Sequence, residues 1–210
     1  MRRLIPTIVL VCLFGCDGPS TNHPEEPDDE LGEGKLDGQG PGGAGSLIGG
    51  EDQDPAVVEA EALLAQGKAR EALTRIDQAI AEQPSIGRFH FVRGNALSYL
   101  DRDGDAQIAY EAAIELDPED PLAYAALGNL LAFGKKASQT DKRAAIAQYQ
   151  KALKLDPELA PAHQALGTVL LDLGDSQRAI EALENANRIA GGVETEYLLA
   201  QAYKQAGNGE

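Results

Sequence analysis

Small and apolar residues between positions 55 and 208 recur at the spacing of one face of an α-helix, and the pattern repeats along the chain. The segment AQIAYEAAIELDP at 106–118 returns as AAIAQYQKALKLDP at 144–157. The segments at 70–84 and 178–192 keep the same order of small and large residues. Spacings of three, four and seven residues place these side chains on one helix face. The sequence therefore predicts four amphipathic helices that are copies of one another.

Each of these predicted helices follows another helix that has its own small residue. In three units a glycine stands four residues after a ring side chain, in the pairs His90 and Gly94, Tyr124 and Gly128, and His163 and Gly167. Ala56 and Ala60 occupy the two places in the first unit. At the other end of a unit, Pro118 and Pro157 disfavour the α conformation of the preceding residue and are predicted to end the second helix. One pair of helices cannot cover its own apolar face, so the pairs are expected to stack.

The order of these residues resembles that of the tetratricopeptide repeat family, whose helix–turn–helix units contain about 34 residues. The second unit carries this order as Gly94, Ala106, Tyr110, Ala113 and Pro118. The resemblance covers Pro55 to Asn208 and implies an all-α fold, a right-handed superhelical solenoid with four repeats and a C-terminal capping helix. It implies repeats at about 53–86, 87–120, 121–159 and 160–193, and a capping helix at 194–207.

The third unit is longer than the others, because residues 134–143 add about five positions between its two predicted helices. This basic insertion contains Lys135, Lys136, Lys142 and Arg143. Two interpretations remain open for it. It is either a docking site for an acidic partner or a phosphate group, or a solvated loop.

The start of the chain has the pattern of an export signal. Two arginines precede an apolar run at 4–14, which is shorter than the roughly 20 residues that a membrane-spanning helix needs. A basic start and a short apolar run are typical of a signal peptide, here residues 1–15. The segment LFGC at 13–16 resembles the bacterial lipobox, which implies diacylglycerol and N-acyl chains such as palmitate on Cys16. Phe14 departs from the small or β-branched residue usual there, and the alternative is an ordinary signal peptide.

Residues 16–54 are rich in acidic residues, glycine and proline, and they contain few apolar side chains. Such a segment buries too little surface to offset its conformational entropy, so it is predicted to be disordered. We expect it to act as a tether between a lipid anchor and the repeats. This layout predicts a lipid-anchored protein of the bacterial cell envelope, on the outer or inner membrane. Asp17 would indicate inner-membrane retention under the enterobacterial rule.

Charge and cysteine content narrow the range of partners. The chain has 34 acidic and 18 basic residues, which gives a formal net charge of −16. This balance argues against nucleic acid and anionic lipid surfaces as partners through bulk electrostatics. The only cysteines are Cys12 and Cys16. We therefore expect no disulfide within the mature domain.

The sequence offers no group of residues suited to catalysis, which needs a nucleophile, a base or a metal held in a pocket. His90 and His163 occupy equivalent places two units apart, and His23 lies in the tether. The acidic run at 101–105 resembles the start of a calcium loop, but it lacks the later glycine and closing glutamate of an EF-hand. It is interpreted as a turn between helices. We expect no enzymatic activity, no metal or cofactor, and no small-molecule substrate.

The resemblance also implies a concave groove lined by the first helices of the repeats. The residue after the skeleton glycine would contact the backbone of an extended peptide, which points to Asn95 and Asn129, with Thr168 in the third place. Helical spacing adds the surrounding residues Arg88, Phe91, Tyr99, Leu122, Phe133 and Gln164. We expect exposed rings among them and amides that face solvent in the free protein. The alternative is that asparagine at this place is common in the family and has no binding role.

Neighbouring positions lack the lysine or arginine of a clamp for C-terminal carboxylates, so that subclass of peptide binding is excluded. The sequence thus indicates a membrane-anchored protein-interaction module, a scaffold or assembly chaperone of the bacterial envelope that binds an extended peptide segment in its groove. The alternative is a structural or self-assembling subunit of an envelope complex, resembling pilotin-like machinery, without peptide binding.

Overall fold

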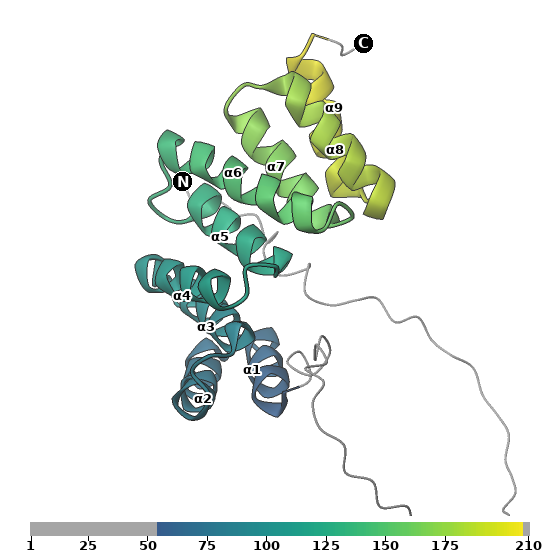
Figure 1. The fold of residues 1–210 in the computed structure, drawn as a ribbon. Helices are drawn as coiled ribbons and strands as arrows, with labels where there is room; N and C mark the ends of the chain where they lie inside the picture. Colours follow the sequence, from purple (N-terminus) through teal and green to yellow (C-terminus); the bar gives the residue numbers. More distant parts are fainter. Residues whose placement is uncertain (1–53, 208–210) are drawn as a thin grey trace, which may run out of the picture. The chain divides into compact units, whose positions relative to one another are not determined.

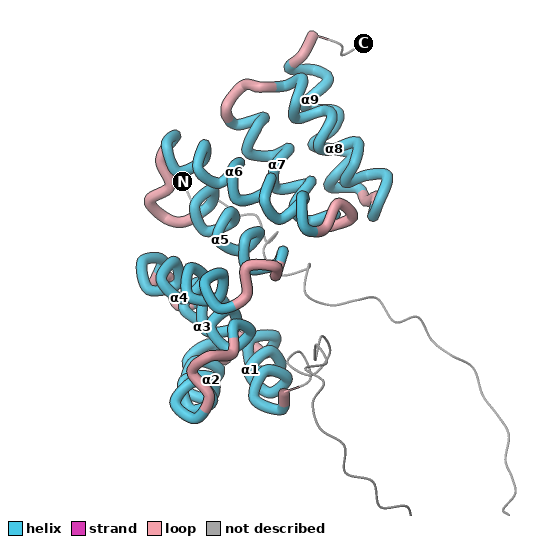
Figure 2. Tube along the Cα trace, in the orientation of Figure 1, coloured by secondary structure: helices cyan, strands magenta, loops and turns pink. Residues whose placement is uncertain are grey.

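A computed structural model describes residues 54–207, and within this range the chain forms nine α-helices and no strand (Figure 1, Figure 2). The helices are α1 (Pro55–Ala65), α2 (Ala69–Glu82), α3 (Gly87–Tyr99), α4 (Asp103–Leu116), α5 (Pro121–Phe133), α6 (Gln139–Leu155), α7 (Ala160–Asp172), α8 (Ser176–Ala190) and α9 (Val193–Gln205). The predicted signal peptide, Cys16 and the predicted tether up to residue 53 lie outside the described residues.

The helices form consecutive pairs, and each pair packs on the next. We call these pairs unit 1 (α1 and α2), unit 2 (α3 and α4), unit 3 (α5 and α6) and unit 4 (α7 and α8). The second helix of each unit contacts the first helix of the following one, and α9 packs on α8. The first helices of successive units also touch, α1 with α3, α3 with α5, and α5 with α7. The predicted stack of two-helix units is confirmed (Figure 1).

The ends of the second helices follow from the prolines after them. The α4 helix ends before Asp117, whose φ and ψ are −133° and 89°, and α6 ends before Asp156, at −130° and 97°. Both residues precede a proline, which disfavours the α conformation of the residue before it. In the next unit Pro121 opens α5, and the Asp120 side chain accepts a hydrogen bond from the Leu122 N–H. The predicted role of the prolines is confirmed.

Three of the four turns inside the units contain one residue in the left-handed region. Gly67 and Gly174 supply it in units 1 and 4, with φ values of 75° and 82°. In unit 2 the same place is taken by Asp101, with a φ of 60°. Aspartate tolerates this conformation better than most residues. The acidic run at 101–105 therefore forms this turn and the start of α4.

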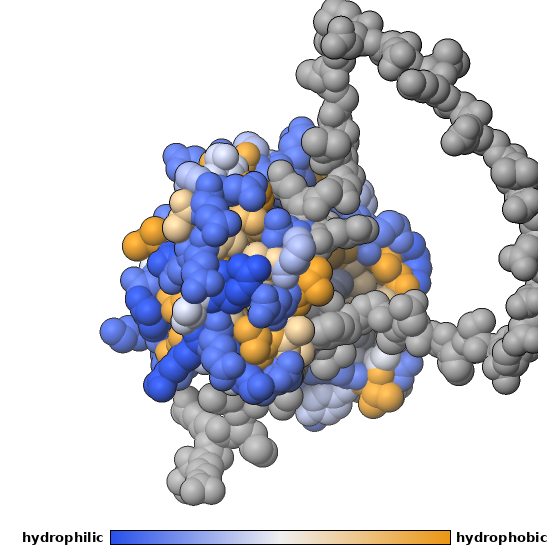
Figure 3. Space-filling view, turned by 90° about the horizontal axis from the view of Figure 1, so that it is seen from below, coloured by the Kyte–Doolittle hydropathy of each residue, from blue (hydrophilic) through white to orange (hydrophobic). Residues whose placement is uncertain are grey.

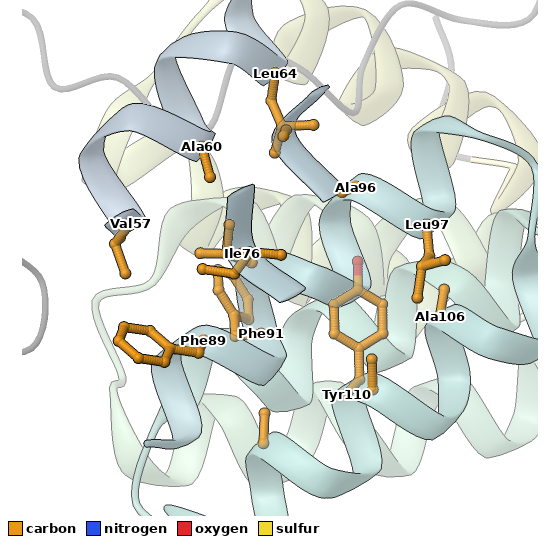
Figure 4. Close-up of a cluster of buried hydrophobic side chains, with 14 of the residues drawn as sticks. Val57, Ala60, Leu64, Ile76, Phe89, Phe91, Ala96, Leu97, Ala106 and Tyr110 are labelled. Carbon is orange, nitrogen blue, oxygen red and sulfur yellow. The ribbon is translucent and has the colours of Figure 1, made fainter. Parts of the chain in front are cut away.

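The core consists of two clusters of buried side chains that meet at α5. One extends from α1 to α5 and the other from α5 to α9. Figure 4 shows part of the first cluster, in which Ile76, Phe89, Phe91, Leu97 and Tyr110 lie together between the helices. Small residues allow this packing, because a Cβ atom on Gly94 would lie 2.5 Å from the Tyr110 ring. A helix pair thus combines a glycine on one helix with a large side chain on the other.

The insertion in unit 3 is only partly a loop. The α6 helix has 17 residues, whereas α4 has 14, and it begins at Gln139. Ser138 caps it, accepting a hydrogen bond from the Asp141 N–H while the Asp141 carboxylate accepts one from the Ser138 N–H. Such a capping box satisfies backbone donors at a helix start. Lys142 and Arg143 therefore belong to a helix, so the solvated-loop interpretation does not describe these two residues.

Candidate functional site

The nine residues predicted to line the groove lie on three neighbouring helices. Arg88, Phe91, Asn95 and Tyr99 are on α3, Leu122, Asn129 and Phe133 are on α5, and Gln164 and Thr168 are on α7. Because α3 contacts α5 and α5 contacts α7, the fold brings the three sets together. We refer to these nine residues as the first-helix face.

Each asparagine side chain of the first-helix face is hydrogen-bonded to a tyrosine of the second helix in its own unit. The Tyr110 hydroxyl donates to Asn95 Oδ1 at 2.8 Å, and the Tyr149 hydroxyl donates to Asn129 Oδ1 at 2.8 Å. The two tyrosine rings lie directly over the skeleton glycines. A Cβ atom on Gly128 would come within 2.7 Å of the Tyr149 ring. The glycine, the tyrosine and the asparagine therefore form one structural group.

The tyrosine hydroxyls act as donors over the physiological pH range. Burial raises the pKa of Tyr149 well above its ordinary value near 10.0. The pKa of Tyr110 is raised in the same way by burial, and the neighbouring Tyr99 adds to the increase. Both hydroxyls thus remain protonated, and each needs an acceptor because it is buried. The asparagine side-chain oxygens provide those acceptors.

The expectation that both amides face solvent was wrong. Asn95 and Asn129 are half-buried, and their oxygens are engaged by the tyrosines. The Asn95 Nδ2 atom is buried and has no hydrogen-bond partner among residues 54–207. A buried donor of this kind costs free energy until it is paired. Spacing along one helix could not reveal these bonds, because they join different helices.

Phe91 corrects a second expectation. It was expected to be an exposed ring, but only 3% of it is exposed, and it packs against Tyr110 with 6.1 Å between ring centroids. The Arg88 guanidinium lies 4.7 Å from the centroid of Phe91 and forms an ion pair with Glu61 at 2.7 Å. Leu122 is half-buried and packs against the first core cluster. These residues support the face more than they form its outer surface.

Two rings of the first-helix face are exposed as predicted. Tyr99 is 39% exposed and Phe133 is 43% exposed. Each stands four residues after an asparagine, so it follows that amide by one helical turn on the same side of its helix. Units 2 and 3 thus present the same pair of side chains, an amide and an exposed ring. We call these the Asn95–Tyr99 and Asn129–Phe133 pairs.

Unit 4 does not repeat this arrangement. The Thr168 hydroxyl donates to the Gln164 carbonyl oxygen of its own helix at 2.9 Å, and Leu183 takes the place of the tyrosine above Gly167. Sequence reasoning missed the tyrosine partners, although a signal was present. Tyrosine stands at the equivalent place in the second helix only in the two units that have asparagine in the first.

Two ion pairs lie beside the first-helix face. Beyond the Arg88–Glu61 pair, Lys142 Nζ lies 2.9 Å from the Asp172 carboxylate at the end of α7. Burial raises the pKa of Asp120, the capping residue of α5, despite the Leu122 N–H bond and the nearby Arg88. In Figure 3, another view of the surface, hydrophilic residues dominate and apolar ones form small groups.

The basic insertion is held by neighbouring units. Lys135 Nζ pairs with Asp101 at 2.7 Å, and its backbone N–H donates to the Asp103 carboxylate at 2.9 Å. Together with the Lys142–Asp172 pair, these contacts tie unit 3 to units 2 and 4. Two of the four basic side chains are therefore already engaged within the chain.

His90 and His163 each contact the turn before their own unit. His90 Nε2 lies 2.8 Å from the Pro84 carbonyl oxygen, and His163 Nε2 lies 3.0 Å from that of Pro157. In residues 54–207, no cluster of three or more His, Cys, Asp or Glu side chains is placed to hold a metal ion. In the same range no helix has both the length and the apolar character needed to cross a membrane.

Comparison with known proteins bears on this repeated architecture. A family model described as a tetratricopeptide repeat matches residues 57–121, and another with that description matches 160–191. A third, described as a TPR repeat, matches 143–174. No curated protein sequence matches the chain.

Solved structures with the same fold cover most of the described residues. MamA is 23% identical, with a TM-score of 0.62 over 74% of this chain and 86% of the other. TTC0263, a TPR protein of Thermus thermophilus, is 20% identical, with a TM-score of 0.63 over 73% and 82%. YrrB, described as a TPR protein with an unusual peptide-binding site, is 20% identical, with a TM-score of 0.57 over 76% and 80%. The repeated helix pairs, their glycine and ring packing and the family matches together show that the chain belongs to the tetratricopeptide repeat family.

Proposed function

We propose that the chain is a protein-interaction module that binds an extended peptide segment on its first-helix face. The observation that carries this proposal is the repetition of an amide and an exposed ring on α3 and α5. Side-chain amides can hydrogen-bond to the backbone of any peptide. Exposed aromatic rings beside polar groups are frequent anchors of binding surfaces. The peptide-binding site of YrrB supports such a use of this fold.

Site-directed photocrosslinking in cells tests this proposal, because it captures a partner of any identity. Tyr99 and Phe133 are each replaced by a photoreactive phenylalanine, and Ile108 on α4 serves as the control because it is also exposed. We expect adducts from the first two positions and none from the third. Adducts from Ile108 alone, or from none of the three, would contradict binding on the first-helix face.

The proposal includes attachment of the module to a membrane through Cys16, as a scaffold or assembly chaperone of the bacterial envelope. It rests on the LFGC segment and on the acidic, glycine-rich residues that follow it. Two or more acyl chains give stable anchoring, which one chain does not. Cys16→Ser should abolish labelling by a radioactive fatty acid and release the protein from membranes. A variant that stays with membranes after a high-salt wash would refute the anchor.

A second candidate function is self-association as a structural subunit. It is favoured by α9, where Val193 is 85% exposed and Tyr197 is 63% exposed, both at the last helix of the stack. Contacts between the ends of successive copies would cover these side chains. Sedimentation over a range of concentrations tests this, because self-association predicts larger species that Tyr197→Lys removes. A single monomeric species at all concentrations would exclude it.

A further inference from the structure

Within residues 54–207, α9 is a first helix without a second helix to cover it. Gly128 and Gly167 are each the eighth residue of a first helix, and Ala200 is the eighth residue of α9. Tyr149 lies over Gly128, and Leu183 lies over Gly167, in both cases from the second helix of the same unit. The α9 helix packs on α8 and α7 (Figure 1). Its other side, which includes Ala200, is exposed.

This other side of α9 carries a continuous line of exposed residues, which we call the α9 seam. The line has spacings of four, three and four residues and consists of Val193, Tyr197, Ala200 and Lys204. Such spacings place side chains along one helix face, as in a coiled coil. Val193 is 85% exposed and Tyr197 is 63% exposed. The corresponding residues of α7, where α8 and α9 pack, are buried or half-buried, namely Ala160, Gln164, Gly167 and Leu171. The α9 seam is therefore a packing surface of the repeat that is left open.

The order of side chains along the α9 seam is complementary to itself in the antiparallel direction. Val193 and Lys204 lie equally far from the midpoint of the seam, and so do Tyr197 and Ala200. When two copies pair antiparallel about that midpoint, the large Tyr197 of each copy lies over the small Ala200 of the other. The same packing of a large residue over a small one joins the two helices of units 2, 3 and 4. A parallel pairing would instead place the two Tyr197 rings against each other.

The charges at the two ends of α9 favour the same direction. The first turn contains Glu194 and Glu196, and the last turn contains Lys204. Antiparallel pairing brings the last turn of each copy beside the first turn of the other, so Lys204 meets Glu194 of the second copy at both ends. Opposite charges that meet across an interface fix its register and orientation. A second copy of this chain thus matches the α9 seam in both size and charge.

We propose that two copies of the chain form a closed, two-fold symmetric dimer by antiparallel packing of α9 on α9. The inference rests on the self-association candidate above and defines its geometry. Because each copy presents the same surface, the contact closes after two copies, whereas contacts between different ends of the chain would continue into filaments. One helix from each copy buries a small area, so the dissociation constant is expected in the micromolar range.

Sedimentation equilibrium of the full chain in density-matched detergent, with micelles in excess, tests the stoichiometry. We expect a reversible equilibrium between monomer and dimer, with no larger species as the concentration rises. Species that grow beyond the dimer and that Tyr197→Lys removes would uphold self-association but overturn the closed dimer. A monomer at every concentration would overturn both. The photocrosslinks from Tyr99 and Phe133 report separately on the first-helix face, so failure of peptide binding is distinguishable from failure of the dimer.

Reversal of the charges tests the antiparallel direction. Glu194→Lys places two lysines at each end of the contact, and Lys204→Glu places two glutamates there. Each single variant should therefore raise the dissociation constant about five- to thirtyfold. The double variant Glu194→Lys/Lys204→Glu has opposite charges again and should return to within about threefold of the wild-type value. Glu181→Lys on α8 and Lys154→Glu on α6 are the matched controls, since both positions are exposed. They should change the dissociation constant less than about threefold.

An equimolar mixture of Glu194→Lys and Lys204→Glu chains should also dimerise like the wild type, because the mixed dimer has opposite charges at both ends. In a parallel pairing, the single variants would not weaken association, because like charges already meet in the wild type. In a contact between α9 and another part of the chain, the double variant would not restore it. Circular dichroism of dilute samples checks that helix content is unchanged. A double variant with wild-type helix content that dimerises as weakly as the single variants would overturn the inference.

Discussion

The two middle units and the two outer units build the same fold with different chemistry. In the middle units a tyrosine lies over a glycine and is hydrogen-bonded to an asparagine. An exposed ring stands one helical turn after that asparagine. In the outer units the corresponding large residues are aliphatic, Ile76 in unit 1 and Leu183 in unit 4, and both are fully buried. Glu61 and Thr168 stand where the middle units have asparagine. Stacking of the units therefore does not require the hydrogen-bonded tyrosine and asparagine.

This difference indicates what each part of the repeat is for. A large side chain over a small residue fills the space between two helices, and isoleucine or leucine does this without a hydrogen bond. Tyrosine adds a buried hydroxyl that has to be paired, which is a cost unless the acceptor is present. The middle units carry this extra polar group together with exposed rings. Its presence there fits a surface used for recognition. Changes of sequence and of pH can test whether the tyrosine–asparagine groups of the middle units behave differently from the aliphatic residues of the outer units.

The largest effect on stability is expected from removing the buried tyrosine ring of a middle unit. Tyr149→Ala should lower the free energy of unfolding by about 3–5 kcal/mol, because it leaves a cavity and also removes the partner of Asn129. Urea denaturation measures this loss. Tyr197→Ala is the control, since Tyr197 is 63% exposed and its removal should change stability by less than about 0.5 kcal/mol. Equal unfolding midpoints would show that Tyr149 does not fill the core.

Alkaline pH should affect the middle units selectively. Burial raises the pKa of Tyr110 and Tyr149 above the ordinary value of 10.0. Above that pH the unfolded chain loses the two protons while the folded chain keeps them, so folding stability falls as pH rises. The slope is up to about 1.4 kcal/mol per pH unit for each tyrosine, and below pH 10 their contribution is constant.

Urea denaturation at several pH values between 9 and about 11.5 measures this slope. The double variant Tyr110→Phe/Tyr149→Phe should lose most of it, because phenylalanine does not titrate. Ile76 and Leu183 fill the same places in the outer units without a titrating group. An unchanged slope in the double variant would show that other groups cause the alkaline loss.

The fold could be predicted from the sequence because its determinants are local and repeated. A glycine at fixed spacing, a large residue in the next helix and a proline at the end recur in nearly every unit. Pro118 and Pro157 act on the residue directly before them, so their effect is readable from the chain alone. Because the pattern recurs, a departure in one unit does not obscure the predicted fold. Asp101, which takes the place of a turn glycine, is such a departure.

The site could be predicted only in outline because its decisive contacts cross between helices. Helical spacing placed Asn95, Tyr99, Asn129 and Phe133 on first helices, and the exposure of the two rings is as expected. Spacing within one helix does not show that Tyr110 reaches Asn95, or that Phe91 turns into the core beneath Arg88. The comparison of whole units does contain this information, since tyrosine and asparagine occur together.

The asparagines should contribute to stability as well as to binding. Asn95→Ala and Asn129→Ala each leave a buried tyrosine hydroxyl without its acceptor, which should cost about 1–3 kcal/mol. Thr168→Ala is the matched change in an outer unit, where the hydroxyl bonds only to its own helix. It should alter stability by less than about 0.5 kcal/mol. Thermal melts of the three variants that coincide would show that the tyrosine–asparagine bonds add nothing to the fold.

The smallest net effect, and the most specific one, concerns the glycine beneath the ring. Gly128→Ala improves helix propensity by up to about 1 kcal/mol, but its Cβ would lie 2.7 and 2.9 Å from two Tyr149 ring atoms. Overpacking of this kind costs about 1–3 kcal/mol, so a net loss of up to about 2 kcal/mol is expected. Gly104→Ala on α4 is the control, because nothing lies within 4 Å of its Cβ position. That change should stabilise the protein by about 0.5–1 kcal/mol.

Ala60 already occupies the equivalent place in unit 1, where it faces Ile76 in place of a tyrosine. Combining Gly128→Ala with Tyr149→Ile should therefore recover part of the stability lost. If the combined variant is destabilised by the sum of the two single changes, the size of the Tyr149 ring is not the reason for glycine at position 128.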